Sequence, residues 1–379
     1  MRSWFVAPPA VLVLALAVLL GGAPLAARAQ DVGFRTVTAP DPQGPPITVG
    51  IWYPTRTPAT APARGMDDLP VAANAPIDGD RLPLVVMSHG NGGWFGGHYD
   101  TAIALAKAGF VVAALTHTGD NYQDQSRATD MANRPRQIHV LIDYMLKDWS
   151  DHGRLDAGRV GAFGFSSGGF TVLAAAGGEL DADRLQPHCQ AHPTHYDCQL
   201  MQRGPLPPGG FTGWVHDDRI KAVVSAAPAL GYAFKAETLK SLRQPVQLWR
   251  AQDDEILPDP FHASAVRASL PNADYHVVAK ARHFDFLTPC NAYTRKTLAF
   301  LCNSDPDFDR AAFHKDFNAS VTAFFKANLA RPGPVAPLVP APGRAEGHKD
   351  AVPRLNRNPQ AAINHDGLLH CALTHEAQS

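Results

Sequence analysis

The chain has 379 residues, of which 45% are hydrophobic, so it can bury the core of one large domain or two small ones. Its 34 basic and 35 acidic residues give a formal net charge of −1, and without a basic excess nucleic acid is not expected as a partner. The 33 prolines and 31 glycines predict long loops and a disordered end.

The N-terminal segment is typical of a secretory signal peptide. Arg2 supplies a positive charge, and residues 10–20 form an apolar run that is short for a membrane span. Ala27, Arg28 and Ala29 then fit the small-x-small cleavage pattern. We therefore expect cleavage near Ala29, export to the periplasm or beyond, and no stable membrane insertion. An uncleaved membrane anchor is the alternative.

Short β-branched apolar runs alternate along the chain with longer segments of helical periodicity. This alternation predicts an α/β fold with a parallel or mostly parallel sheet covered by helices. The expected strands cover residues 47–53, which are placed in an edge hairpin, and then 84–87, 110–116, 160–165, 222–226, 246–250 and 275–279. The expected helices cover residues 100–108, 136–149, 170–176, 261–270 and 311–329.

Two segments lie outside this alternation. Residues 178–219 are rich in Cys, His, Pro and Gly, and we interpret them as an insertion or lid over the sheet. Residues 331–379 are rich in Pro and Ala and lack periodicity, which predicts a disordered tail. The folded domain is therefore expected to span residues 30–330, after a signal peptide over residues 1–29.

Five cysteines are present, and export makes disulfides possible. An odd count leaves at least one cysteine unpaired within the chain. The pairing that closes the shortest loops joins Cys189 to Cys198 and Cys290 to Cys302, and it leaves Cys371 in the tail.

Residues 164–168 (GFSSG) match the pattern G-x-S-x-G between an expected strand and an expected helix. Such a turn holds its central serine in a strained backbone conformation, and Gly164 and Gly168 relieve crowding on either side. We predict Ser166 as a nucleophile and the backbone N–H of Ser167 as an oxyanion donor. The alternatives are Ser167 as the nucleophile and a Gly/Ser turn without chemistry.

A serine hydroxyl needs a base, and the base needs a group that orients it. Asp254 and His283 each follow a later expected strand, in the order serine, acid, histidine. We predict His283 as the general base and Asp254 as the acid. The alternatives are a structural role for the histidine and, for the acid, Asp253, Glu255 or Asp285.

Residues 89–93 (HGNGG) follow the expected strand 84–87, and their glycines let the backbone approach a ligand closely. The N–H of Asn91 is the candidate second oxyanion donor, with an ordinary glycine-rich turn as the alternative. Trp94, Phe95 and Phe165 are candidate substrate-binding residues, with core packing as the alternative.

Histidine and cysteine, both zinc ligands, gather between residues 188 and 198 as His188, Cys189, His192, His195 and Cys198. In an exported protein we favour a disulfide with exposed histidines over a structural zinc site. No metal and no cofactor is expected in catalysis.

Four segments in this order resemble the α/β-hydrolase superfamily: SHGNGG at 88–93, GFSSGG at 164–169, DDEILP at 253–258 and RHFDFL at 282–287. They most resemble the bacterial dienelactone-hydrolase-like branch related to platelet-activating-factor acetylhydrolase. IWYP at 51–54 and Cys290, soon after the histidine, also fit that branch. The resemblance covers about residues 33–328 and departs from the pattern twice: dienelactone hydrolases use cysteine where Ser166 stands, and the acetylhydrolases usually carry histidine where Phe165 stands.

The resemblance implies an α/β-hydrolase fold with a mostly parallel central sheet and a lid-like insertion. It also implies a triad of Ser166, Asp254 and His283, with Asn91 and Ser167 supplying the oxyanion hole. The sequence therefore predicts an acetylhydrolase-like serine esterase that acts on a small-molecule or lipid-like carboxylic ester through an acyl-enzyme. The alternatives are a peptidase or polyester hydrolase on the same triad, or a catalytically silent binding protein of the same fold.

Overall fold

The computed structural model describes residues 31–59, 70–204 and 213–330, and these residues hold nine strands in one sheet. The strands are β1 (Asp31–Ala39), β2 (Ile47–Thr55), β3 (Ala72–Ala73), β4 (Leu82–Ser88), β5 (Val111–Thr116), β6 (Leu155–Phe165), β7 (Ile220–Ala226), β8 (Val246–Ala251) and β9 (Asp274–Val278). Their order across the sheet is β3-β1-β2-β5-β4-β6-β7-β8-β9.

The sheet is mixed but mostly parallel, as the sequence predicts. Every neighbouring pair from β5 through β4 and β6 to β9 is parallel. β1 and β2 form an antiparallel hairpin, and β2 joins β5 in antiparallel register. Because the parallel strands share one direction, their carboxyl ends meet at one edge, where the loops after β4, β6, β8 and β9 come together.

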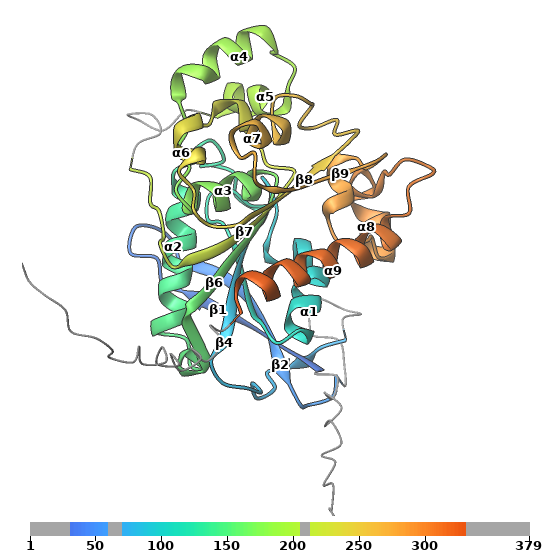
Figure 1. Ribbon diagram of the computed structural model, residues 1–379. Coiled ribbons are helices and arrows are strands. Elements are labelled where there is room, and N and C mark those ends of the chain that lie inside the picture. Colours follow the sequence, from blue (N-terminus) through green and yellow to red (C-terminus); the bar gives the residue numbers. More distant parts are fainter. Residues whose placement is uncertain (1–30, 60–69, 205–212, 331–379) are drawn as a thin grey trace, which may run out of the picture. The chain divides into compact units, whose positions relative to one another are not determined.

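Helices cover both faces of the sheet (Figure 1). The α-helices of the described chain are α1 (Tyr99–Lys107), α2 (Asn133–Lys147), α3 (Ser167–Ala175), α4 (Leu185–Ala191), α5 (Tyr196–Arg203), α6 (Ala236–Lys240), α7 (Ala263–Ser269), α8 (Ala292–Thr297) and α9 (Arg310–Asn328). α2, α3 and α7 pack in one apolar cluster with Val86 of β4, and α1 and α9 pack in the other with Val85. Successive side chains of a strand point to opposite faces, so these two valines serve different cores.

The described part of the insertion, residues 178–204 and 213–219, contains the short helices α4 and α5. Both lie at the top of the view in Figure 1, beyond the carboxyl ends of the parallel strands. The Cys189–Cys198 disulfide joins the two helices, and a second disulfide joins Cys290 to Cys302. Both predicted pairings are confirmed.

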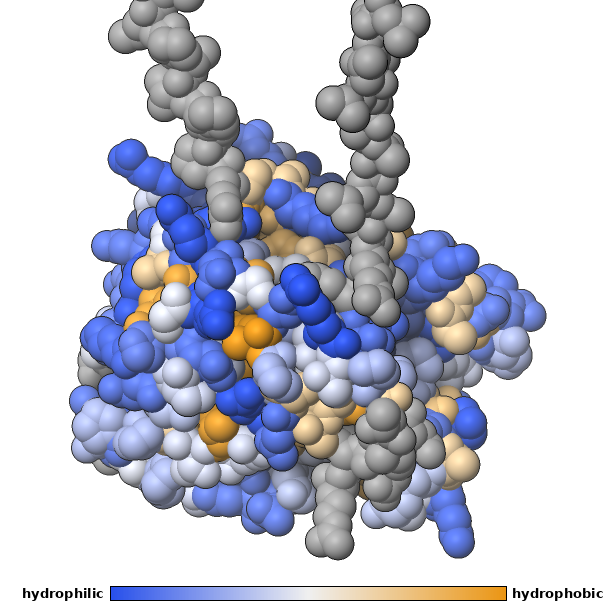
Figure 2. Space-filling model, turned by 90° about the horizontal axis from the view of Figure 1, so that it is seen from below, coloured by the Kyte–Doolittle hydropathy of each residue, from blue (hydrophilic) through white to orange (hydrophobic). Residues whose placement is uncertain are grey.

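The predicted signal peptide, the tail and Cys371 lie outside the described residues. Within the described ranges, no helix combines the length and the apolar character that a membrane span requires. The face seen from below in Figure 2 is mostly hydrophilic, with hydrophobic residues in small separate patches.

Candidate active site

Ser166 lies in the tight turn between β6 and α3. Its φ of +58° is a conformation that residues other than glycine rarely adopt, which indicates a strained backbone. A Cβ added to Gly164 would overlap the carbonyl oxygen of Gly168, and one added to Gly168 would overlap the carbonyl oxygen of Ser88. Both glycines are therefore required for the helix start to pack this closely against the sheet.

The structure brings the three predicted triad side chains together. His283 Nε2 lies 3.0 Å from Ser166 Oγ, and His283 Nδ1 lies 2.8 Å from Asp254 Oδ2. The other carboxylate oxygen of Asp254 accepts hydrogen bonds from the backbone N–H groups of Ile256 (3.1 Å) and Leu257 (2.7 Å). The carboxylate is therefore fixed by its own loop, with one oxygen left to orient the imidazole.

The rival acids occupy other positions. Asp253 is exposed, and Glu255 accepts a hydrogen bond from the backbone N–H of His283 rather than from its ring (3.2 Å). Asp285 accepts a hydrogen bond from the N–H of Arg282 (2.8 Å) and caps the short 3-10 helix that begins at His283. Of the carboxylates that the sequence leaves open, Asp254 contacts the imidazole.

The loop over residues 89–93 lies against Ser166, the predicted nucleophile. A Cβ added to Gly90 would stand 3.2 Å from the Cβ of Ser166, so the glycine permits this approach. The next residue along the loop is Asn91. Ser167 is the first residue of α3, so its N–H has no acceptor inside the helix. These positions favour the two predicted donors.

A buried ion pair supports this loop from behind. Asp120 pairs with Arg134 of α2, and both side chains are almost fully buried. The second oxygen of Asp120 accepts hydrogen bonds from the side-chain amide of Asn91 (2.6 Å) and the N–H of Gly92 (3.0 Å). The guanidinium also donates to the carbonyl oxygen of His89. The sequence analysis missed this pair, because no local pattern connects residues 14 positions apart in a loop and a helix.

Two buried histidines fix the ends of β4 and β5. His89 Nε2 accepts a hydrogen bond from the N–H of His117 (2.9 Å), and the ring of His117 contacts Ser88 (2.8 Å) and Gln137 (2.7 Å). Burial, with a smaller contribution from the charge of Arg134, lowers the pKa of His89 to about 3, and the pKa of His117 is also well below its ordinary value. Both rings are therefore neutral at neutral pH and act as parts of the structure.

Comparisons with known proteins concern the fold and the family that this chain resembles. The family described as platelet-activating factor acetylhydrolase, isoform II, matches residues 57–142. A bis(hydroxyethyl) terephthalate hydrolase of Streptomyces coelicolor is 35% identical over 98 residues, which are 24% of this chain and 27% of that relative. A solved structure, a ferulic acid esterase from Streptomyces cinnamoneus, is similar with a TM-score of 0.54 at 19% identity, over 85% of this chain and 96% of the other. The chain has the α/β-hydrolase fold.

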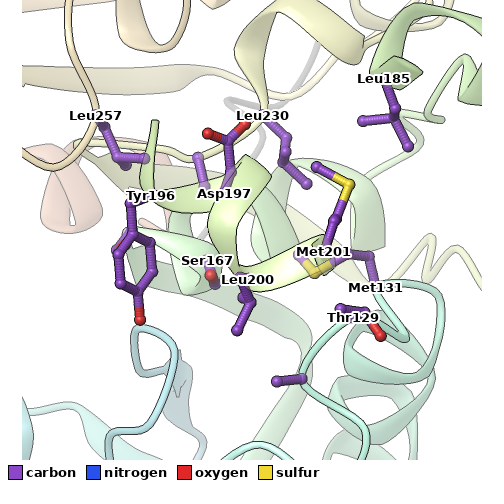
Figure 3. A pocket seen from close by; sticks show the side chains of 13 residues that line it. Thr129, Met131, Ser167, Leu185, Tyr196, Asp197, Leu200, Met201, Leu230 and Leu257 are labelled. Carbon is purple, nitrogen blue, oxygen red and sulfur yellow. The ribbon is translucent and has the colours of Figure 1, made fainter. Parts of the chain in front are cut away.

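A pocket opens beside Ser166, the predicted nucleophile (Figure 3). Its walls come from the loop before α2, the start of α3, the insertion, and the loops after β7 and β8. The described residues that line it are Ala128, Thr129, Met131, Ser166, Ser167, Leu185, Tyr196, Asp197, Leu200, Met201, Ala229, Leu230 and Leu257. Most of them are apolar, so the pocket favours a substrate with an apolar group.

The three aromatic residues predicted to bind substrate are not among the described residues that line this pocket. Phe95 packs on Trp52 in the core (ring centroids 6.2 Å apart), and Trp94 packs on Phe95 (4.8 Å). Phe165 is buried, and its ring lies 4.8 Å from the ring of His283. Phe165 belongs to the apolar cluster that also contains α1 and α9, and the half-buried Trp94 and Phe95 pack against that cluster.

The insertion supplies pocket residues that the sequence analysis missed: Leu185, Tyr196, Asp197, Leu200 and Met201. The Tyr196 hydroxyl also donates a hydrogen bond to the side-chain oxygen of Asn91 (2.5 Å). The insertion therefore contacts the loop that carries the predicted oxyanion donor. The apolar residues of α5, set in a polar segment, are the sequence signal for this role.

Proposed function

We propose that the protein is a carboxylic ester hydrolase that works through an acyl-enzyme on Ser166. The observation that carries the proposal is the continuous contact from the serine oxygen through both imidazole nitrogens of His283 to Asp254, with heavy-atom distances of 3.0 and 2.8 Å. These distances lie within the range for a nucleophile and its base. The similarity to a bis(hydroxyethyl) terephthalate hydrolase over a quarter of the chain supports the same reaction class.

In the first step Ser166 Oγ attacks the ester carbonyl carbon while His283 Nε2 takes the hydroxyl proton. The imidazolium that forms is stabilised by Asp254, which keeps Nδ1 protonated and facing the carboxylate. The tetrahedral intermediate then breaks its bond to the alkoxy oxygen, which leaves as the alcohol with the proton from Nε2. Water, activated by the same imidazole, hydrolyses the acyl-enzyme and restores the free serine.

The negative charge on the carbonyl oxygen needs donors that are already in place. We assign the backbone N–H groups of Asn91 and Ser167 to this role, since both flank the nucleophile and Ser167 begins a helix. Each such donor lowers the barrier by about 3 kcal/mol, since removing one from a known hydrolase costs roughly that much. The buried Asp120–Arg134 pair holds the Asn91 loop, so this hole is preorganised.

The substrate is assigned by class from the pocket. Leucine and methionine side chains predominate around Ser166, which suits an apolar acyl or alcohol group of a small-molecule or lipid-like ester. A terephthalate diester is the second candidate, because the similar enzyme of Streptomyces coelicolor carries that substrate in its name. The acetylhydrolase family matches residues 57–142, and this match favours esters of short acids.

Fluorophosphonate labelling with mass-spectrometric site mapping tests the nucleophile. We expect one adduct on Ser166, lost in Ser166→Ala and strongly slowed in His283→Ala. The matched control is Ser241→Ala, at an exposed serine after α6, which should label like the unchanged protein. An adduct that persists in Ser166→Ala refutes the site, and an intact protein that does not label identifies a catalytically silent binding protein.

A substrate panel tests the reaction class. We expect turnover of p-nitrophenyl esters, with a terephthalate diester and polyester film as further arms and aminoacyl nitroanilides as the peptidase arm. Hydrolysis of the anilides in preference to the esters contradicts the proposal. Selective cleavage of the terephthalate ester or of the film supports the second candidate.

We also propose that the protein is exported and that residues 30–330 form its hydrolase domain, with residues 178–219 as a lid. The Cys189–Cys198 and Cys290–Cys302 disulfides favour an oxidising compartment. N-terminal sequencing of protein from the culture medium or periplasm should give Gln30 as the first residue. Protein that starts at Met1 and stays in the membrane fraction contradicts export with cleavage.

A further inference from the structure

A buried cluster of histidine and carboxylate side chains joins the insertion to the catalytic domain. His195 and Asp197 flank the start of α5, and His262 immediately precedes α7. One ligand-type atom from each of the three lies within 4.8 Å of the others. The cluster is separate from the proposed triad and has no role in the mechanism above.

Three atoms in this cluster lack a partner. Both ring nitrogens of His262 and the Oδ1 atom of Asp197 make no hydrogen bond within the described residues. Exposure is 1% for His262 and 6% for Asp197, so water outside the protein does not satisfy these atoms. Buried polar atoms are nearly always hydrogen-bonded or bound to an ion, and three orphans in one place therefore indicate a ligand.

The groups around the cluster determine which of its atoms are left to bind an ion. The Tyr232 hydroxyl donates to Asp197 Oδ2 (2.8 Å), which leaves Oδ1 facing the cluster. His188 Nε2 lies 3.3 Å from His195 Nδ1, and the His188 ring stacks on Tyr232 with centroids 3.6 Å apart. Nδ1 of His195 is engaged in this contact, so Nε2 is the nitrogen left to bind an ion, and a second partner of this kind is usual for metal-binding histidines.

We propose that His195, Asp197 and His262 bind one Zn²⁺ ion, with water in the fourth position. Two imidazole nitrogens and one carboxylate oxygen form a donor set typical of zinc. Ligand atoms around tetrahedral zinc are about 3.3 Å apart for metal–ligand distances near 2.0–2.1 Å. The three side chains therefore move closer when the ion binds, and His195, the least buried of them, has the most room to do so.

Cys198 also lies near His188 and Asp197, but its sulfur is bonded to Cys189 and supplies no thiolate. The zinc site therefore differs from the one that the His and Cys spacing suggests. Of the proposed ligands, His195 belongs to that His and Cys motif, whereas Asp197 and His262 are not indicated by its spacing.

Zinc at this position ties the insertion to the segment that follows the acid loop. Asp197 lines the pocket that contains Ser166, and His262 lines a smaller pocket with Asp254 and Leu257. The ion is a structural link that holds α5 over the pocket. The inference does not rest on the proposed hydrolase activity, because zinc binding and stability are measured without a substrate.

The test uses the full-length mature protein with no histidine tag. After dialysis against a chelator, Zn²⁺ is titrated by calorimetry, and bound metal is counted by mass spectrometry. We expect one ion per chain, a rise in Tm on binding, and visible absorption typical of a four-coordinate ion when Co²⁺ replaces Zn²⁺. No binding by the chelated protein, with the chelated state still folded by circular dichroism, overturns the proposal.

Variants locate the ion. His262→Ala and Asp197→Asn should weaken binding by more than about 100-fold, because even the loss of a group behind a metal ligand costs 10–100-fold. His192→Ala is the matched control, since His192 stacks on His195 but is outside the proposed ligand set. The control should keep stoichiometric zinc. If His262→Ala binds zinc as tightly as the unchanged protein, or if His192→Ala loses the ion, the proposed ligand set is wrong.

Discussion

Replacing Arg134 with methionine tests how much the buried ion pair behind the loop over residues 89–93 contributes to the stability of the fold. The guanidinium is 2% exposed, pairs with Asp120 (3% exposed), and donates to Thr171 (2.9 Å) and to the carbonyl oxygen of His89. Its removal leaves a buried carboxylate without a cation, which costs about 3–5 kcal/mol in comparable cases. Asp120 keeps two hydrogen-bond donors from the loop, which places the expected loss of unfolding free energy near the lower limit, about 3 kcal/mol.

The double variant Arg134→Met with Asp120→Asn should recover more than half of that loss. An asparagine carries no charge, and its side-chain oxygen still accepts from Asn91 and Gly92. Equilibrium unfolding in urea measures all three proteins. Arg184→Met is the matched control, because Arg184 pairs with Asp181 at the surface, and such pairs contribute at most about 1 kcal/mol. A single variant within 1 kcal/mol of the unchanged protein, or a double variant less stable than the single, refutes the argument.

Three further predictions follow from single contacts. Gly168→Ala should destabilise the protein or prevent folding, because the new methyl group meets a backbone carbonyl. Gly153→Ala is the control and should change Tm little, because its methyl group meets nothing within 4 Å. Equal melting temperatures for the two variants contradict this prediction. Tyr196→Phe removes the hydrogen bond to Asn91 (2.5 Å). This variant should lower kcat/KM for a p-nitrophenyl ester several-fold, which corresponds to a loss of about 1 kcal/mol, and should leave Tm nearly unchanged. Unaltered kinetics contradict this prediction. Burial lowers the pKa of His98 from 6.5 to about 3, so the unfolded chain binds a proton below pH 6.5 that the folded chain does not. Unfolding free energy is therefore lost as pH falls from 6.5 toward 3. In urea unfolding, His98→Asn should reduce the loss between pH 7 and pH 5 by about 2 kcal/mol. Equal losses in the variant and the unchanged protein contradict this prediction.

The central sheet and the elbow could be predicted because their signals are local. Each parallel strand is a short apolar run, and β6, the turn and α3 follow one another within 21 residues. The glycines at 164 and 168 could be predicted because they belong to the motif itself, although a side chain at 164 would meet Gly168 and one at 168 would meet the backbone of Ser88 in β4. Strand ends differ from the prediction by a few residues, since hydrogen bonding continues past the apolar run.

The identity of the acid illustrates the limit of local information. Residues 253–255 are three adjacent carboxylates, and no pattern in the chain separates them. The structure separates them because the backbone N–H groups of Ile256 and Leu257 bind one oxygen of Asp254 and direct the other to His283. The choice of acid depends on the turn geometry, which the sequence does not determine by spacing.

The pocket could not be predicted, because its walls come from long-range packing. Trp94 and Phe95 are aromatic and follow the loop after β4, but they are half-buried and pack against the core next to Trp52 instead of lining the pocket. α4 and α5 are seven and eight residues long, too short for helical periodicity to stand out in a histidine- and proline-rich segment. The proposed zinc ligands Asp197 and His262 are 65 positions apart, and residue spacing does not predict such a contact.

The insertion contacts both sides of the proposed catalytic centre. Tyr196 holds Asn91, whose loop is fixed from behind by Asp120, while the adjacent Asp197 lies beside His262, which shares a small pocket with Asp254. Outward movement of α5 would break the first contact and separate the second pair at once, because their residues are neighbours in the chain. The proposed zinc ion would oppose such a movement of α5, whereas Asp120 still holds the loop over residues 89–93 when Tyr196 leaves it.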